Sequence, residues 1–131
     1  MARTLAAAGL VALAFAGTGA ASWSLAASGG GAARALSLGA GPAPTVGTIT
    51  GTLTRNVPLS WTAVHGAAGY VVRRYDVTGL LTVIGGPCTG VVTSTNCTDQ
   101  NVALGLTWRY TVQPENGLWL GTEGPATTVM T

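Results

Sequence analysis

Apolar and polar residues alternate through most of the chain after Pro44, and this alternation constrains the fold more than any other feature of the sequence. It is clearest at 57–63, 70–75 and 107–113, where successive side chains of an extended chain point to opposite faces. A period of two is typical of a strand with one buried face. Weaker runs of the same kind cover 46–53, 80–84, 91–96 and 127–131.

Turn-forming residues separate these runs. Glycine tolerates the backbone angles of tight turns and proline interrupts strands, so clusters of either residue mark the connections. The clusters are His65-Gly66, Thr78-Gly79, Gly85-Gly86-Pro87, Asn116-Gly117 and Gly124-Pro125. About seven short strands with such turns, and no amphipathic helix between them, are the pattern of an antiparallel β-sandwich. We therefore predict an all-β domain over residues 45–131.

The N-terminal segment, residues 1–21, has the pattern of a signal peptide. Arg3 lies beside the α-amino group, an apolar run covers Leu5–Ala16, and Thr18-Gly19-Ala20 has the small residues that signal peptidase accepts. The alternative is an uncleaved membrane anchor, because the apolar part of residues 1–27 is close to the ~20 residues that span a bilayer. In both cases we expect the rest of the chain to be secreted or at the cell surface, with membrane contact only through residues 1–27.

Residues 22–44 have the composition of a flexible linker. Gly29-Gly30-Gly31 gives the backbone great freedom, and Pro42 and Pro44 interrupt regular structure. We therefore divide the chain into a signal peptide or anchor at 1–21, a linker at 22–44 and a β-domain at 45–131.

The chain has two cysteines, Cys88 and Cys97. An exported protein meets oxidising conditions in which a disulfide persists, and a bridge would supplement the small core of a domain of this size. The alternatives are a redox pair, whose cysteines lie closer together, and a metal site, which needs more ligands than the single histidine adds. We predict a structural disulfide, no metal and no cofactor.

Charged residues make up 8% of the chain, all six basic residues are arginine, and the net charge is +2. A nucleic-acid-binding domain needs a concentrated basic surface to displace phosphate counterions, which this composition does not provide. We therefore expect no nucleic-acid partner. The scarcity of charge, together with many Ala, Gly and Thr residues, indicates a GC-rich and bacterial origin.

Three stretches, taken in order, resemble a known family. VPLSWTAVHGAAGYVVRR resembles strands B and C of a fibronectin type III domain, TSTNCTDQNVALGLTWRYTV resembles its strands E and F, and EGPATTVMT resembles its last strand. The resemblance spans residues 44–131 and depends on the order and spacing of the pieces. It implies an immunoglobulin-like sandwich in which strands A, B and E pack on strands C, C′, F and G.

Two residues depart from the family's pattern. Cys97 stands in strand E where an aromatic or aliphatic residue is usual, and Trp108 stands where the family's Tyr hydroxyl bonds back to the upstream backbone. An indole N–H can donate in a similar way, although its reach and direction differ. The resemblance and the alternation together predict core or corner positions for Trp61, Tyr70, Trp108 and Tyr110.

A weaker similarity concerns the front half of the chain. A leader, a segment such as ASWSLAASGGGAARALSLGA and a β-sandwich form the layout of exported bacterial proteins that are processed by the ER-type class of signal peptidase. Some of these proteins assemble into matrix fibres. The similarity implies an alternative function, a structural subunit in which residues 22–45 add a strand to a neighbour's sheet.

The residues that a hydrolase would use do not form a recognisable motif. His65 lies in a predicted turn with no adjacent nucleophile. The carboxylates fall on scattered turns and strand ends, whereas glycoside hydrolysis requires a pair at a set separation. They are Asp76, Asp99, Glu115 and Glu123. We therefore expect no catalytic residue and rank a small secreted hydrolase last among the alternatives.

The candidate binding surface consists of Trp119, Tyr75, Arg73 and Arg109. Tyr75 and Arg73 are expected on the outward face of one strand, next to Arg109 on another, and Trp119 in or just after the turn that follows. An exposed Trp stacks on sugar faces or anchors a protein interface. The alternative is that Leu118 or Trp119 folds over the end of the core.

These observations predict an exported, non-catalytic module that binds a protein or polysaccharide of the cell envelope, or acts as a spacer at the bacterial cell surface. A monomer is favoured over a polymer. The carbohydrate association is implied only by the resemblance, because bacterial modules of this family often accompany secreted polysaccharide-degrading enzymes.

Overall fold

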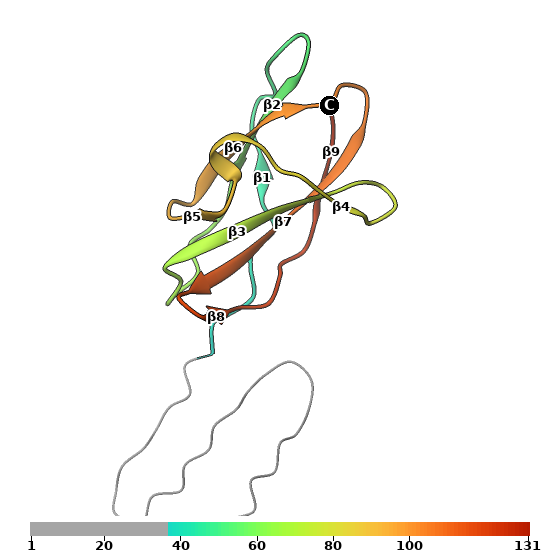
Figure 1. Ribbon diagram of the computed structural model, residues 1–131. Helices are drawn as coiled ribbons and strands as arrows, with labels where there is room; N and C mark the ends of the chain where they lie inside the picture. Colours follow the sequence, from blue (N-terminus) through green and yellow to red (C-terminus); the bar gives the residue numbers. More distant parts are fainter. Residues whose placement is uncertain (1–36) are drawn as a thin grey trace, which may run out of the picture. The chain divides into compact units, whose positions relative to one another are not determined.

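Residues 37–131 form two antiparallel β-sheets that share one core in the computed structural model (Figure 1). The strands are β1 (Thr45–Val46), β2 (Arg55–Ser60), β3 (Gly69–Tyr75), β4 (Leu81–Thr82), β5 (Val91–Val92), β6 (Asn96–Val102), β7 (Thr107–Asn116), β8 (Trp119–Leu120) and β9 (Thr127–Met130). One 3-10 turn, η1 (Gly86–Cys88), accompanies them. The described part of the chain holds no helix with the length and apolar character to cross a membrane. The predicted signal peptide (1–21) and residues 22–36 of the predicted linker lie outside the described residues.

The two sheets confirm the predicted sandwich. One sheet has the order β1-β2-β6, and the other has the order β4-β3-β7-β8, with β5 also beside β3 and β9 also beside β7. This is the three-on-four arrangement that the resemblance implied, with the short strands β5 and β8 added. The register of β3 and β7 pairs Gly69 with Glu115 at one end, called here the hairpin end, and Tyr75 with Arg109 at the other, called here the far end.

The weaker runs form shorter strands than the alternation predicted. The run 80–84 contributes only β4, and the run 91–96 divides between β5 and the first residue of β6. β4 and β5 both pair antiparallel with β3, opposite its last and its first residues respectively, so they are two pieces of one interrupted strand. The interruption is the segment 83–90, which leaves β3 and packs against β6 instead.

A disulfide holds the segment 83–90 in place. Cys88 is bonded to Cys97 of β6, and both residues are buried in the core. Gly85 approaches β6 so closely that a Cβ atom there would overlap the carbonyl oxygen of Gln100. Because β6 is an outer strand of its sheet, this packing leaves less of its edge free to pair with another chain.

The core lies between the sheets and is rich in aromatic rings. Trp61, Tyr70, Trp108 and Tyr110 are all buried, at the positions where a core or corner role was expected. The rings of Trp61 and Tyr70 meet edge to face with their centroids 5.4 Å apart. Edge-to-face pairs add to the stability that aromatic burial provides.

β6 places a charged residue, Asp99, in this core and has a β-bulge directly after it. The register of β6 against β2 shifts by one residue between Asp99 and Val102. Asn101 lies within the shift and adopts a φ of 60°, a left-handed conformation that Asn tolerates better than most residues. Asp99 and Val102 are three positions apart in sequence, and the extra residue allows both side chains to be fully buried.

The chain packs against the sandwich before β1 begins. The Gly41 N–H donates to the Thr122 carbonyl over 2.8 Å, and the Thr127 hydroxyl donates to the Pro44 carbonyl over 2.5 Å. A Cβ atom at Gly41 would overlap the carbonyl oxygen of Val112, so only glycine fits here without a backbone shift. The last residues of the predicted linker are therefore part of the domain.

Candidate functional site

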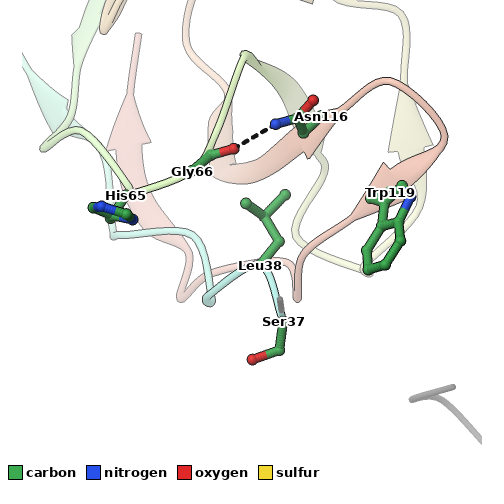
Figure 2. A pocket seen from close by; sticks show the side chains of 6 residues that line it. All are labelled: Ser37, Leu38, His65, Gly66, Asn116 and Trp119. Carbon is green, nitrogen blue, oxygen red and sulfur yellow. Dashed lines mark hydrogen bonds between the residues drawn. The ribbon is translucent and has the colours of Figure 1, made fainter. Parts of the chain in front are cut away.

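Trp119 lies beside an open hollow at the hairpin end. The hollow has a volume of about 390 Å³, and the indole of Trp119 lines one side of it (Figure 2). The lining residues are Ser37, Leu38, His65, Gly66, Asn116 and Trp119. The Asn116 side-chain amide donates to the Gly66 carbonyl over 2.8 Å and so ties the turn after β7 to the turn before β3.

The turn between β7 and β8 projects three large apolar side chains into solvent. It is a two-residue loop, Gly117-Leu118, in which Gly117 has a φ of 61° and Leu118 has a negative φ, as in a type II′ hairpin. Leu118 is 100% exposed, Trp119 57% and Leu120 61%. We call these three residues the hairpin tip. Leu118 therefore does not fold over the core, and more than half of the Trp119 surface is open to solvent.

The predicted binding residues divide between two faces. Arg109 alternates with the core residues Trp108 and Tyr110, so it points outward, and its register with Tyr75 places both on the outer face of the sheet. Arg73 shares that face by the same alternation. Trp119 pairs with Asn116, which lies on the core side of β7, so the structure does not bring Trp119 together with the other three.

The polar groups on the outer face are largely bonded to one another. Glu123 accepts hydrogen bonds from the Tyr75 hydroxyl, over 2.7 Å, and from the Thr111 hydroxyl. The Arg73 guanidinium lies 3.7 Å from Glu123 and donates to the Gln113 side chain over 2.6 Å. These bonds fasten the segment after β8 to β3 across β7, which gives Tyr75 and Arg73 a structural role.

This network shifts the pKa values of its members. The pKa of Tyr75 is raised, mainly by burial. The hydrogen bond to Glu123 and the negative charge of Glu123 raise it further. Burial alone would raise the pKa of Glu123, but the hydrogen bonds from Thr111 and Tyr75 and the charge of Arg73 bring it below its ordinary value. Glu123 is therefore held as a carboxylate at neutral pH.

A second polar network lies inside the sandwich, and the sequence analysis did not identify it. The Asp99 carboxylate accepts hydrogen bonds from the Arg74 guanidinium at 2.7 Å, the Tyr110 hydroxyl at 2.8 Å and the Gly85 N–H at 2.7 Å. The expectation that Asp99 lies on a turn or strand end is wrong, because Asp99 lies within β6, opposite Val57 and on the same buried face as Cys97. The alternation did place Arg74 on the same face as Tyr70 and Val72, which is the one signal that pointed to a buried arginine.

This network strongly shifts the pKa of Tyr110. Burial, and then the charge and hydrogen bond of Asp99, raise the pKa of Tyr110 far above its ordinary value of 10.0. The phenol therefore stays protonated and continues to donate to Asp99 throughout the physiological pH range.

Trp108 is buried at the expected corner but does not make the expected hydrogen bond. Its indole nitrogen Nε1 has no hydrogen-bond partner within the described chain. The Arg74 guanidinium lies over the indole ring instead, 4.7 Å from its centroid. A stacked cation takes the place of the backbone hydrogen bond that a tyrosine would make, since the indole N–H points differently from a phenolic hydroxyl.

The residues considered for catalysis lie apart. His65 is exposed in the turn before β3, and Asp76 accepts hydrogen bonds from the backbone of Thr78 and Leu80 within its own turn. Within residues 37–131, the side chains that commonly bind metals form no group of three or more. The arrangement offers binding surfaces and internal polar contacts.

Solved structures share this architecture. No protein-family model and no curated protein sequence matches the chain. The structure of titin domains A168–A170 superposes with a TM-score of 0.59 and 18% identity, over 72% of this chain and 32% of the titin chain. A fibronectin type III domain of the human KIAA0970 protein superposes with a TM-score of 0.55 and 20% sequence identity, over 67% of this chain and 69% of that chain. An Fn3-like protein from Clostridium thermocellum superposes with a TM-score of 0.54 and 24% sequence identity, over 67% of this chain and 86% of that chain.

The domain has a fibronectin type III-like fold. At these levels of identity the likeness concerns the fold, and it accounts for the two sheets and their strand order. The comparisons do not describe the finer features of this fibronectin type III-like domain. Three of these features are seen in the structure of this chain itself: the disulfide-linked segment 83–90, the buried Arg74–Asp99 pair and the hairpin tip.

Proposed function

We propose that this fibronectin type III-like chain is an exported, non-catalytic interaction module that acts at the cell surface through its hairpin end. The hairpin tip carries the proposal. Leu118, Trp119 and Leu120 are consecutive, large, apolar and more than half exposed. Soluble domains keep contiguous apolar surface small unless it binds something, and Trp is enriched among residues that dominate binding energy.

The state of three of the four carboxylates supports a non-catalytic role. Asp99 is fully buried and bonded to Arg74, Asp76 is held by its own turn, and Glu123 is bonded to Tyr75. A general acid or base must reach a substrate proton within hydrogen-bond distance. Groups that are buried or already saturated by internal partners are poorly suited to that task.

A polysaccharide of the envelope is the partner class that we propose for this end. A sugar ring has an apolar face that stacks on an indole and hydroxyl groups that bond to nearby polar side chains. At the hairpin end the Trp119 indole, His65 and Asn116 line one hollow, with Trp119 and His65 on opposite sides of it (Figure 2). The arrangement offers one stacking surface and two polar side chains within a single open site.

Retention of the exported chain on purified cell envelope and on a panel of insoluble glycans tests the proposal. We expect Trp119→Ala to lower retention at least several-fold. The matched control is Leu53→Ala, which also removes an exposed large apolar side chain, 88% exposed, but outside the hairpin end. Retention that is equal for wild type and Trp119→Ala would contradict a role for the hairpin end, and retention on envelope protein alone would contradict the polysaccharide.

The proposed export is tested separately. We expect the chain in the medium or envelope fraction, with N-terminal sequencing that starts near Ser22 if the leader is cleaved. A chain found only in the cytoplasm would contradict the proposal whatever the retention assay shows.

A further inference from the structure

Asn116 differs from the other asparagines of this chain in the residue that follows it. The sequence contains four asparagines, and Asn116 is the one followed by glycine. The other three are followed by valine or cysteine and are Asn56, Asn96 and Asn101. The backbone nitrogen of the next residue can attack an asparagine side-chain amide, because one chain holds the two groups within reach of each other. Glycine has no Cβ atom to hinder this approach, so Asn116 is the asparagine most open to such an attack.

The backbone after Asn116 leaves the attacking nitrogen accessible. Asn116 is the last residue of β7, and both Asn116 and Gly117 are exposed. The ladder between β7 and β8 ends with the pair Asn116–Trp119, so Gly117 lies in the loop outside that ladder. Among residues 37–131, no backbone carbonyl accepts a hydrogen bond from the Gly117 N–H. The nitrogen is therefore open to solvent and is not held by the sheet.

A hydrogen bond restrains the side-chain amide of Asn116. Its nitrogen, Nδ2, donates to the Gly66 carbonyl over 2.8 Å, across the gap between two turns (Figure 2). Both turns are exposed, and contacts between exposed turns open locally at a small cost in free energy. The bond therefore slows a reaction at this amide and does not prevent it.

We infer that Asn116 is a site of spontaneous deamidation. The Gly117 nitrogen attacks Cγ of Asn116, and the N–Cγ bond forms as the nitrogen gives its proton to water or hydroxide. The Cγ–Nδ2 bond then breaks, and Nδ2 takes up a proton and leaves as ammonia, which closes a five-membered cyclic imide. Water adds to either ring carbonyl and reopens the ring to an aspartate or an isoaspartate. The net reaction consumes water, releases ammonia and involves no oxidation or reduction.

Both products break the contact between the two turns. A carboxylate has no N–H to donate, and it brings a negative charge toward the Gly66 carbonyl oxygen that now accepts from Asn116. In the isoaspartate the main chain continues through Cγ, which adds an atom to the backbone just before the loop and displaces the hairpin tip. Because Asn116 and Gly66 line the same hollow as Trp119, the reaction changes the candidate binding site itself.

The effect on binding rests on the proposed function, whereas the chemical step does not. Deamidation removes the amide of one of the two polar side chains that were proposed to bond to a sugar, and it frees the turn that carries the other, His65. We therefore expect the deamidated chain to bind the envelope more weakly. Since the reaction is not reversed by water, the time since synthesis would then limit how long each molecule is retained.

Peptide mass spectrometry of the purified exported chain, incubated warm at mildly alkaline pH, tests the chemical step. The other three asparagines are internal controls, because they experience the same solution. We expect Asn116 to deamidate at least several-fold faster than each of them. In Asn116→Gln the same attack would need a six-membered ring, so position 116 should keep its amide. A rate at Asn116 no greater than at Asn56, Asn96 and Asn101 would overturn the inference.

Retention on purified envelope tests the consequence. We expect Asn116→Asp to lower retention several-fold, and incubated wild type to lose retention in proportion to its deamidated fraction. Asn116→Gln should be retained equally before and after incubation, which controls for other damage. A thermal melt of each sample shows whether it is folded.

The two readouts fail separately. If Asn116 deamidates but folded Asn116→Asp is retained like the wild type, the inferred effect on the hairpin end is wrong. If Asn116 does not deamidate while Trp119→Ala still lowers retention, the inference fails and the proposed function stands. If retention does not depend on Trp119, the proposed function fails, and mass spectrometry still decides whether Asn116 is modified.

Discussion

Arg74 and Asp99 form an ion pair that joins the two sheets, with Nη1 and Oδ2 2.7 Å apart and the Asp99 side chain wholly buried. Arg74 belongs to the larger sheet and Asp99 to the smaller one, so the pair fixes how the sheets face each other. The Gly85 N–H also donates to Asp99, which ties the segment 83–90 to the same point. One buried carboxylate thus organises both sheets and the loop between them.

Removal of one partner should destabilise the domain strongly. We expect Asp99→Ala to lower the free energy of unfolding by about 3–5 kcal/mol, because it leaves the Arg74 guanidinium buried without a counter-charge. In Arg74→Met/Asp99→Leu both charges are gone, and the loss should be smaller than for Asp99→Ala alone. Urea unfolding of the wild type, each single variant and the double variant measures the coupling, and strictly additive losses would contradict the pair.

Trp108 should matter for stability, and Trp119 should not. Trp108→Ala removes a buried indole that packs under Arg74, and we expect a loss of about 3–5 kcal/mol. Trp119→Ala truncates a side chain that is 57% exposed, and the change should stay within about 0.5 kcal/mol. Chemical denaturation of both variants makes the comparison. If Trp108→Ala kept its stability but lost binding, Trp108 would have a role in binding and not in the stability of the core.

The disulfide should contribute measurably to stability. The bridge closes a short loop with a sequence separation of 9, for which the chain-entropy model gives about 2–3 kcal/mol. We expect Cys88→Ala/Cys97→Ala to lose this amount, and the wild type to lose a similar amount under reducing conditions. If reducing agent destabilises the double variant as well, the effect has another source.

Acid should weaken the outer-face network through Glu123. The pKa of Glu123 is lower in the folded chain than the ordinary value of 4.5, so its contribution is present above that value and is lost as the pH falls through the folded pKa. Between about pH 5 and pH 3 the wild type should therefore lose more stability than Glu123→Gln, which cannot titrate at this position. Parallel denaturation curves at several pH values test this, and equal losses would contradict it.

Replacement of Gly41 tests whether the domain begins before β1. Gly41→Ala places a methyl group against the Val112 carbonyl oxygen and should cost about 1–3 kcal/mol through overpacking. Gly39→Ala is the control, because a Cβ atom there would lie 3.5 Å from Val64, an ordinary contact. Thermal melts of the two variants should differ clearly. A neutral Gly41→Ala would mean that this part of the chain does not pack as described.

Local patterns were sufficient for the strand assignments that depend on one face being buried. The alternation around Trp61, Tyr70 and Trp108 identified the core faces of β2, β3 and β7, because burial of one face requires a period of two. The Asn116-Gly117 dipeptide marked the hairpin turn, because glycine readily adopts a positive φ. The predicted pairing of Cys88 with Cys97 also agrees with the structure, where the two sulfurs are bonded.

Only the tertiary structure decided the features that depend on contacts between distant segments. The bulge that follows Asp99 and brings Val102 to the core face depends on how β6 meets β2, and no local pattern encodes it. The departure of the segment 83–90 from β3 depends on partners in β6, and the close packing of Gly41 depends on Val112. The separation of Trp119 from Tyr75 has the same origin, since both lie in exposed positions by sequence and only the register of β7 with its neighbours places them on opposite faces. Local sequence determines which side chains alternate, whereas the free energy of packing distant strands determines which of them meet.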